Sequence, residues 1–141
     1  MSKNIKKLKK VLHKEGLRFT SQREAVWNEI ISSDEHRNAD EIYMAIRQNG
    51  VLVSRATVYR TIDVLVKNNM VRKLDVGVGP SKFEHKMNTS HHDHIICIQC
   101  GHIEEFVVDQ IESLQDSVAK EYEFILVRHI HQLFGICKDC Q

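Results

Sequence analysis

The first half of the chain repeats apolar residues at helical spacing. Ile5, Leu8 and Leu12 recur every three or four positions before Gly16, and glycine commonly ends a helix. Three further segments show the same spacing. Each begins beside residues that can cap a helix, namely Thr20 or Ser21 with Glu24, then Asn38, and then Ser54. We therefore expect four helices, at about residues 5–16, 21–31, 39–49 and 55–66.

A short connection and a hairpin complete this half. Residues 50–54 are too few for anything but a turn, so the third and fourth helices form a helix-turn-helix pair. Residues 70–75 and 81–84 predict two strands around a glycine- and proline-containing turn, the wing of a winged-helix domain. An exposed arginine on a helix is usually only solvated, but beside a wing five residues of the fourth helix become candidates for DNA contact: Arg55, Thr57, Tyr59, Arg60 and Thr61.

The second half predicts a small α/β domain. Strands are expected at residues 94–97, 103–108 and 124–134, with an amphipathic helix at 109–119. A sheet this small leaves its edges unprotected, so we expect it to pair with a second copy in a two-fold homodimer. The fold class is α+β, with a winged-helix domain at 1–84, a polar hinge at 85–90 and a dimerisation domain at 91–141.

Charge separates the same two halves. Residues 1–84 carry 16 Lys and Arg against 10 Asp and Glu, whereas residues 85–141 carry 4 against 9. Seven of the nine histidines also lie in the acidic half. This asymmetry indicates an anion-binding module joined to a metal-binding module. The polar, basic N-terminus has no long apolar run, so we expect a cytoplasmic protein without a membrane segment.

The cysteines form two CxxC pairs, Cys97 with Cys100 and Cys137 with Cys140. Two such turns supply the four thiolates of a tetrahedral structural zinc site. A redox-active pair is less favoured because the first CxxC follows a strand, whereas redox motifs open a helix. Disulfides would need an oxidising compartment.

Four metal ligands precede the first cysteine pair. Because strand side chains alternate between two faces, His92 and His94 share one face, and His91 and Asp93 share the other. This alternation predicts two different metal sites. Each pair alone has too few ligands, and the candidates for the rest are Glu84, Glu105, Glu112, His36 and His129. Imidazole with carboxylate suits labile Fe(II), Mn(II), Co(II), Ni(II) or Zn(II).

Several motifs together resemble the ferric uptake regulator (Fur) family of dimeric, metal-dependent bacterial repressors. They are residues 16–23, GLRFTSQR; residues 55–60, RATVYR; residues 91–94, HHDH; and the two CxxC pairs, the first followed by Gly101. The resemblance covers nearly the whole chain. It implies a winged-helix domain hinged to a dimerisation domain that holds structural zinc on the four cysteines.

The resemblance also implies two further ligand sets and a mechanism. A regulatory site at the domain junction would use His36, Glu84, His92, His94 and Glu105, and a second site would use His91, Asp93, Glu112 and His129. Arg18 would lie near the minor groove or the DNA backbone. Ion binding at the junction would fix the angle between the domains, and hence the spacing of two recognition helices on double-stranded operator DNA.

The sensed metal is inferred from three residues. Iron sensors resembling this chain usually carry Glu84, Glu105 and Arg60, whereas peroxide sensors typically carry Asp, Asp and Asn. We therefore expect an Fe(II)-responsive repressor of iron-uptake genes, with a peroxide-sensing regulator and a zinc or manganese regulator as alternatives. Two departures are His131, on the strand face of His129, and His102 in the first cysteine loop.

Other classes of protein are less favoured. A metal-dependent hydrolase would need a positioned general base, and no phosphate loop or nucleophile motif accompanies the ligands. We expect no enzyme activity and no small organic substrate. A zinc-stapled scaffold would leave the Arg55–Arg60 segment unexplained. The expected assembly is a homodimer, with a tetramer as a further state.

Overall fold

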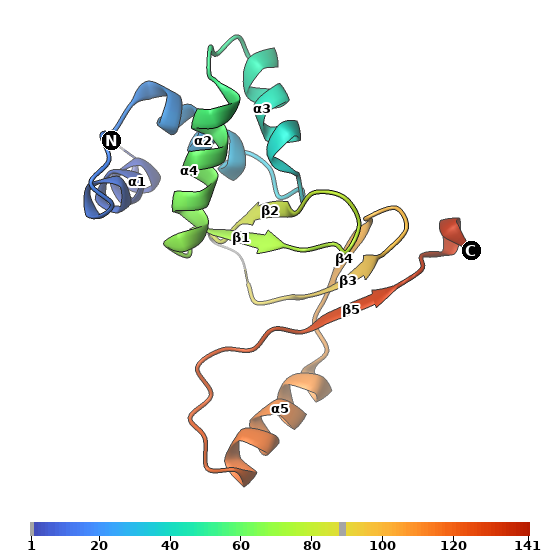
Figure 1. The fold of residues 1–141 in the computed structure, drawn as a ribbon. Helices are drawn as coiled ribbons and strands as arrows, with labels where there is room; N and C mark the ends of the chain where they lie inside the picture. The colour runs from blue at the N-terminus through green and yellow to red at the C-terminus, as the bar shows by residue number, and fades with distance from the viewer. Residues whose placement is uncertain (1, 88–89) are drawn as a thin grey trace. The chain divides into compact units, whose positions relative to one another are not determined.

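The computed structural model describes residues 2–87 and 90–141, and the chain divides into two compact units. The first comprises the residues up to Asp75 and the segment that starts at Pro80. The second comprises Val76–Gly79 and Ser90–Gln141. The elements of both units are labelled in Figure 1. The predicted α+β class is confirmed.

Four helices build the first unit: α1 (Lys3–Lys14), α2 (Ser21–Ile31), α3 (Ala39–Gln48) and α4 (Arg55–Lys67). Each begins after a capping side chain that accepts a backbone N–H bond. For α2 the cap is Thr20, which accepts from the N–H of Arg23 at 3.3 Å. The alternative of Ser21 with Glu24 is therefore wrong, because Ser21 is already the first helical residue.

Glycine ends α1 and α3 abruptly. Gly16 has φ of 70°, and the N–H of the next residue, Leu17, donates to the carbonyl of Leu12 at 2.8 Å. Gly50, with φ of 80°, allows the same bond from Val51 to Ile46 at 3.3 Å. This left-handed C-cap suits glycine, which has no Cβ to clash. Both helices can therefore turn directly into the next segment.

A wing follows the helices. Strands β1 (Val71–Leu74) and β2 (Lys82–His85) pair antiparallel, with Val71 opposite His85. The helices and these strands enclose one core whose largest fully buried residue is Trp27. His85 was expected to open the hinge, but it is the buried last residue of β2. Residues 88 and 89 of the predicted hinge lie outside the described residues.

The second unit contains β3 (Asp93–Cys97), β4 (Ile103–Phe106), α5 (Asp109–Glu121), β5 (Gln132–Gly135) and the short 3₁₀ helix η1 (Lys138–Cys140). The strand order is β4-β3-β5. β3 runs antiparallel to β4 and parallel to β5. β3 is therefore the central strand, with β4 on one side and β5 on the other.

The predicted strand at 124–134 is wrong over most of its length, since only 132–135 pair. Residues 124–127 and Ile130 are apolar, but none of the residues 124–131 belongs to a strand. Ile125, Val127 and Ile130 are 92%, 89% and 80% exposed. Figure 1 shows the chain leaving α5 and returning to β5 through this extended segment. Among the described residues, no helix is long and apolar enough to span a membrane.

Candidate metal centres and nucleic-acid interface

The four cysteines converge in the second unit. Cys97 ends β3, Cys100 follows in a turn closed by Gly101, Cys137 immediately precedes η1, and Cys140 is the last residue of η1. All four are free thiols, with their sulfur atoms within 4.8 Å of one another. The sulfurs of Cys100 and Cys137 are 3.8 Å apart. Thiolates about 2.3 Å from a tetrahedral zinc ion are about 3.8 Å apart, so the geometry fits zinc.

The protonation of these thiols also depends on their crowding. Backbone N–H groups, chiefly those of Cys137 and Cys100, lower the pKa of the Cys97 thiol to about 6. The adjacent thiols of Cys137 and Cys100 raise the pKa of Cys140 to about 12. The Cys97 thiolate therefore forms readily, whereas the raised pKa values of Cys100 and Cys140 make these two thiols resist ionising. A bound divalent cation would allow all of them to ionise.

A second cluster joins β3, α5 and the segment before β5. Nε2 of His91 lies 3.3 Å from Oδ1 of Asp93 and 3.4 Å from Oε1 of Glu112. Nε2 of His129 lies 3.5 Å from each of the same two oxygens. Ligands about 2.1 Å from a tetrahedral ion are roughly 3.4 Å apart. These four side chains therefore have the spacing of ligands around one ion.

The remaining metal-ligand candidates form one group in each unit. In the first, Nε2 of His36 lies 2.8 Å from Oε2 of Glu84, which is 5% exposed. Arg72 donates to the other oxygen of Glu84 at 2.9 Å. The loop that carries His36 is tied to β2, because Arg37 and Phe83 exchange two backbone hydrogen bonds of 3.2 and 2.7 Å. The fold thus holds these two ligands together before any ion binds.

The group in the second unit has three ligands. His94 is opposite Glu105 across the β3–β4 pair. Nε2 of His92 lies 3.4 Å from Oε1 of Glu105, and the rings of His92 and His94 are 4.8 Å apart. His94 is buried, whereas Glu105 is exposed. This group offers one carboxylate and two imidazoles, a set suited to a divalent transition metal.

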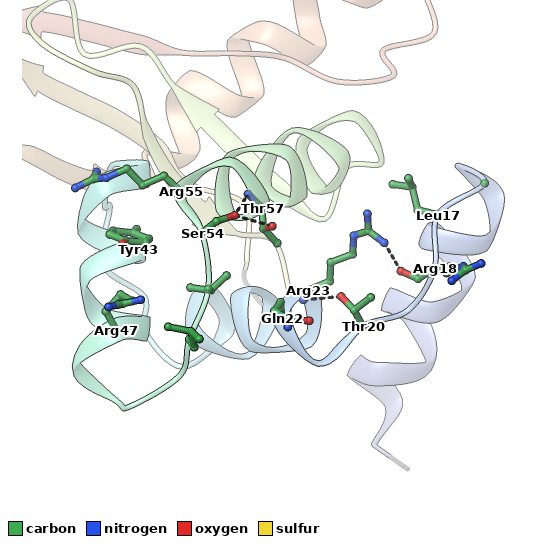
Figure 2. A pocket seen from close by; sticks show the side chains of 13 residues that line it. Leu17, Arg18, Thr20, Gln22, Arg23, Tyr43, Arg47, Ser54, Arg55 and Thr57 are labelled. Atoms are coloured by element: carbon green, nitrogen blue, oxygen red, sulfur yellow. Dashed lines mark hydrogen bonds between the residues drawn. The ribbon is translucent and has the colours of Figure 1, made fainter.

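A basic groove of about 1060 Å³ lies on the first unit. It is lined by the α1–α2 turn, the starts of α2 and α4, and α3, and Figure 2 labels its four arginines, Arg18, Arg23, Arg47 and Arg55. Arg18 and Arg55 were expected at such a site. Arg23 and Arg47 were missed, because on their helices they resemble ordinary solvated residues. Only the packing of the helices reveals that four arginines share one concave surface.

Contacts at the start of α4 hold several DNA-contact candidates in place. The Arg55 guanidinium lies 4.5 Å from the centre of the Tyr43 ring and pairs with the Asp40 carboxylate. Tyr59 donates to Asp40 at 3.0 Å, and this bond raises the pKa of the Tyr59 hydroxyl. Arg55 and Tyr59 are thus oriented by one acidic residue.

Thr57 and Arg60 differ from these residues. The hydroxyl of Ser54 lies 3.0 Å from that of Thr57 and accepts the Thr57 N–H, so Thr57 is part of the helix cap. Arg60 is exposed, one turn further along α4. The expectation for Thr61 is wrong, because it is 2% exposed and its hydroxyl donates to the Thr57 carbonyl at 2.6 Å. An exposed arginine in the first two turns of the second helix of a helix-turn-helix pair is placed to reach base edges.

An apolar groove of about 620 Å³ runs along α5 in the second unit. No residue of α5 is buried. Leu114 is 66% exposed, and Tyr122 and Phe124 are 67% and 74% exposed. So large an exposed apolar surface is typical of a protein interface.

A winged-helix unit with an arginine-lined groove, joined to a unit with thiolate and imidazole–carboxylate clusters, defines a metal-responsive DNA-binding protein. Residues 14–134 match the model of the Ferric uptake regulator family. The chain therefore belongs to this family of transcriptional regulators, and it is a metal-dependent DNA-binding regulator rather than an enzyme. The resemblance seen in the sequence is confirmed, and the hydrolase alternative is wrong.

Individual relatives agree with this assignment. A Ferric uptake regulation protein from Campylobacter jejuni is 41% identical over 138 residues, covering 96% of this chain and 87% of that protein. A Peroxide-responsive repressor PerR from Staphylococcus aureus is 36% identical over 130 residues, 92% of this chain and 86% of that protein. The Helicobacter pylori ferric uptake regulator, described as having three functional metal-binding sites, superposes with a TM-score of 0.85 at 35% identity, covering 96% and 90% of the two chains.

Proposed function

We propose that this chain is an Fe(II)-responsive repressor that binds double-stranded operator DNA as a homodimer in the cytoplasm. The observation that carries the proposal is the pair of incomplete ligand groups, one in each unit. His36 and Glu84 number only two, and His92, His94 and Glu105 only three. Five or six ligands of this kind suit Fe(II). Neither group alone supplies enough ligands for Fe(II), so we infer that both groups bind the same ion.

Sharing an ion couples metal binding to DNA binding. His36 and Glu84 are fixed to the unit that carries α4, and the other three ligands to the unit with the apolar groove. An ion held by all five would favour one orientation of the two units. In a homodimer that orientation sets the spacing of the two α4 helices, which must match two half-sites on DNA. The difference in the ion's affinity for this orientation and for other orientations is the free energy that couples metal binding to DNA binding.

The other two clusters have different roles in this proposal. Cys97, Cys100, Cys137 and Cys140 would hold structural zinc, which completes the fold of a unit with few buried apolar residues. His91, Asp93, Glu112 and His129 would hold a further divalent ion against α5. The exposed apolar groove beside them supports pairing with a second copy, and two dimers forming a tetramer is a further state.

DNA contact would divide between base reading and backbone contact. Arg60, with Arg55 and Tyr59, would contact base edges in the major groove, and Thr57 would contact phosphate near the helix start. Arg18, with Arg23 and Arg47 of the same groove, would contact phosphates or the minor groove.

Three side chains, those of Glu84, Glu105 and Arg60, favour an iron sensor over a peroxide sensor. Relatives include both an iron regulator and a peroxide-responsive repressor, so overall similarity does not separate the two. Glu84, Glu105 and Arg60 match the residues usual in the iron branch. A peroxide-sensing regulator is the second candidate, and a zinc or manganese regulator the third.

Two neighbouring carboxylates provide the test. Glu105 belongs to the proposed regulatory set, whereas Glu104, its neighbour in β4, pairs instead with His102, with Oε1 2.8 Å from Nε2. Operator binding would be followed by fluorescence anisotropy under anaerobic conditions, with Fe(II), Mn(II), Zn(II) or a chelator. We expect Fe(II) to activate the wild type and Glu104→Ala but not Glu105→Ala. Activation of Glu105→Ala as strong as that of wild type would refute the assignment, and activation by Zn(II) alone would favour a zinc regulator.

A further inference from the structure

Asp93 is a buried carboxylate with unusual surroundings. It is 1% exposed, and neither of its oxygens accepts a hydrogen bond within the described part of the chain. Burying an ionised carboxylate without hydrogen bonds is costly unless a cation lies beside it. Imidazoles surround it on both sides: His91 and His129 face Oδ1, and His131 faces Oδ2 at 3.7 Å.

The sheet fixes where His131 lies. Parallel pairing places His94 opposite Gln132, and the His94 N–H donates to the His131 carbonyl at 3.4 Å. His131 is therefore abreast of Asp93, on the opposite side from Phe106, the β4 partner of Asp93. The rings of Phe106 and His131 meet edge to face, with centres 5.6 Å apart. This contact holds the imidazole with Nδ1 buried and directed to the carboxylate.

The two carboxylate oxygens have different neighbours. Oδ1 belongs to the cluster formed with His91, Glu112 and His129, whose ligand atoms lie within 4.8 Å of one another. His131 is not a member of that cluster. Its Nδ1 approaches Oδ2 instead, and a movement of about 0.8 Å would bring this pair to an ordinary hydrogen-bond length of about 2.9 Å.

We propose that His131 is a positioning residue of the second metal site, donating from Nδ1–H to Oδ2 of Asp93 and so keeping that carboxylate bound through Oδ1 alone. This inference rests on the proposed function, in which the cluster holds a divalent ion. If Asp93 binds the ion through Oδ1 alone, the site has four ligand atoms, the number that Zn(II) and Co(II) accept. Binding by both oxygens would raise the coordination number and favour ions such as Mn(II).

His131 would therefore set both affinity and metal preference at this site. Partners that hydrogen-bond to a metal ligand typically contribute 10- to 100-fold in metal affinity. Two substitutions test whether the hydrogen-bond donor of His131 is what matters or only the bulk of its side chain. His131→Asn keeps an N–H donor near the position of Nδ1. His131→Leu introduces an apolar side chain of similar size that has no donor.

Cobalt(II) absorption provides a readout that is independent of DNA binding, because four-coordinate Co(II) absorbs much more strongly than five- or six-coordinate Co(II). Zinc-loaded protein of each variant would be titrated with Co(II) and Mn(II). We expect His131→Leu to weaken the second-site Co(II) bands and lower Co(II) affinity about 10- to 100-fold, with a smaller loss for Mn(II). His131→Asn should retain the wild-type bands and affinity.

Glu112→Gln distinguishes failure of this inference from failure of the site itself. If Glu112→Gln removes one Co(II) per chain while His131→Leu matches the wild type, the site exists and the role of His131 is refuted. Loss of the four-coordinate bands in His131→Asn as complete as in His131→Leu also refutes hydrogen-bond donation. If Glu112→Gln leaves Co(II) stoichiometry and spectrum unchanged, the second site itself is wrong, and the inference falls with it.

Discussion

Replacing Cys137 with serine should unfold the second unit while leaving the first intact. Structural zinc contributes about 10–16 kcal/mol to the folding of small zinc-binding peptides at pH 7, which is comparable to the whole stability of a domain at about 5–15 kcal/mol. Burial within a single chain cannot replace that contribution. Among the described residues of this unit, the buried apolar side chains are Val76, Ile96 and Cys97, and a fully buried aliphatic side chain supplies only about 1.5–3 kcal/mol.

Hydrogen exchange measured by mass spectrometry can localise this effect. In Cys137→Ser, amides of β3 and β5 should lose protection and the dimer should dissociate. Amides of α2 and α4 should keep theirs, because the core around Trp27 draws its residues from the first unit. Gln99→Ser, in the loop of the first cysteine pair, leaves all four thiols and should behave as wild type. Retention of one zinc per chain with full β3 protection in Cys137→Ser would refute the structural role.

Three further predictions address the DNA, the thiols and the sensed signal. Arg60→Ala should cost about 1–3 kcal/mol on the operator and relax preference at one base pair, whereas Arg18→Ala should weaken all sequences alike; equal losses on operator and random DNA for both variants would contradict this division. In zinc-free protein the second unit should unfold and lose the backbone N–H groups that lower the Cys97 pKa to about 6, so thiolate absorbance should show no step near pH 6, and a step there that disappears in Cys97→Ser would contradict the structural role of zinc. The Fe(II) protein exposed to low peroxide should gain no oxygen on His36 or His92 by mass spectrometry, and rapid gain with release of operator would favour the peroxide sensor.

Local signals made the first unit predictable from sequence. Asn38 and Ser54 cap their helices, and Gly16 and Gly50 end theirs, as the pattern indicates. Helix caps and the 3.6-residue period depend on neighbours within a few positions, so a single sequence contains the needed information. The choice between Thr20 and Ser21 was the exception, since both side chains can cap.

Strand pairing and the finer site geometry were less predictable. The apolar residues at 124–131 suggested a strand, but pairing depends on partners far along the chain, and only 132–135 find one. Alternation of side chains grouped His91 with Asp93, yet the approach of His131 to Oδ2 depends on the register between β3 and β5. That Arg23 and Arg47 line the basic groove was likewise not predictable, because it depends on how three helices pack.

Reciprocal coupling tests the central claim most directly. If Fe(II) raises operator affinity by favouring one orientation of the two units, operator must raise Fe(II) affinity by the same factor, typically about 5- to 150-fold. Anaerobic calorimetric titration of the zinc-loaded dimer with Fe(II), with and without operator duplex, measures that factor. The account predicts equal factors in both directions for wild type and loss of both in Glu105→Ala. Fe(II) affinity that is identical with and without operator would contradict it.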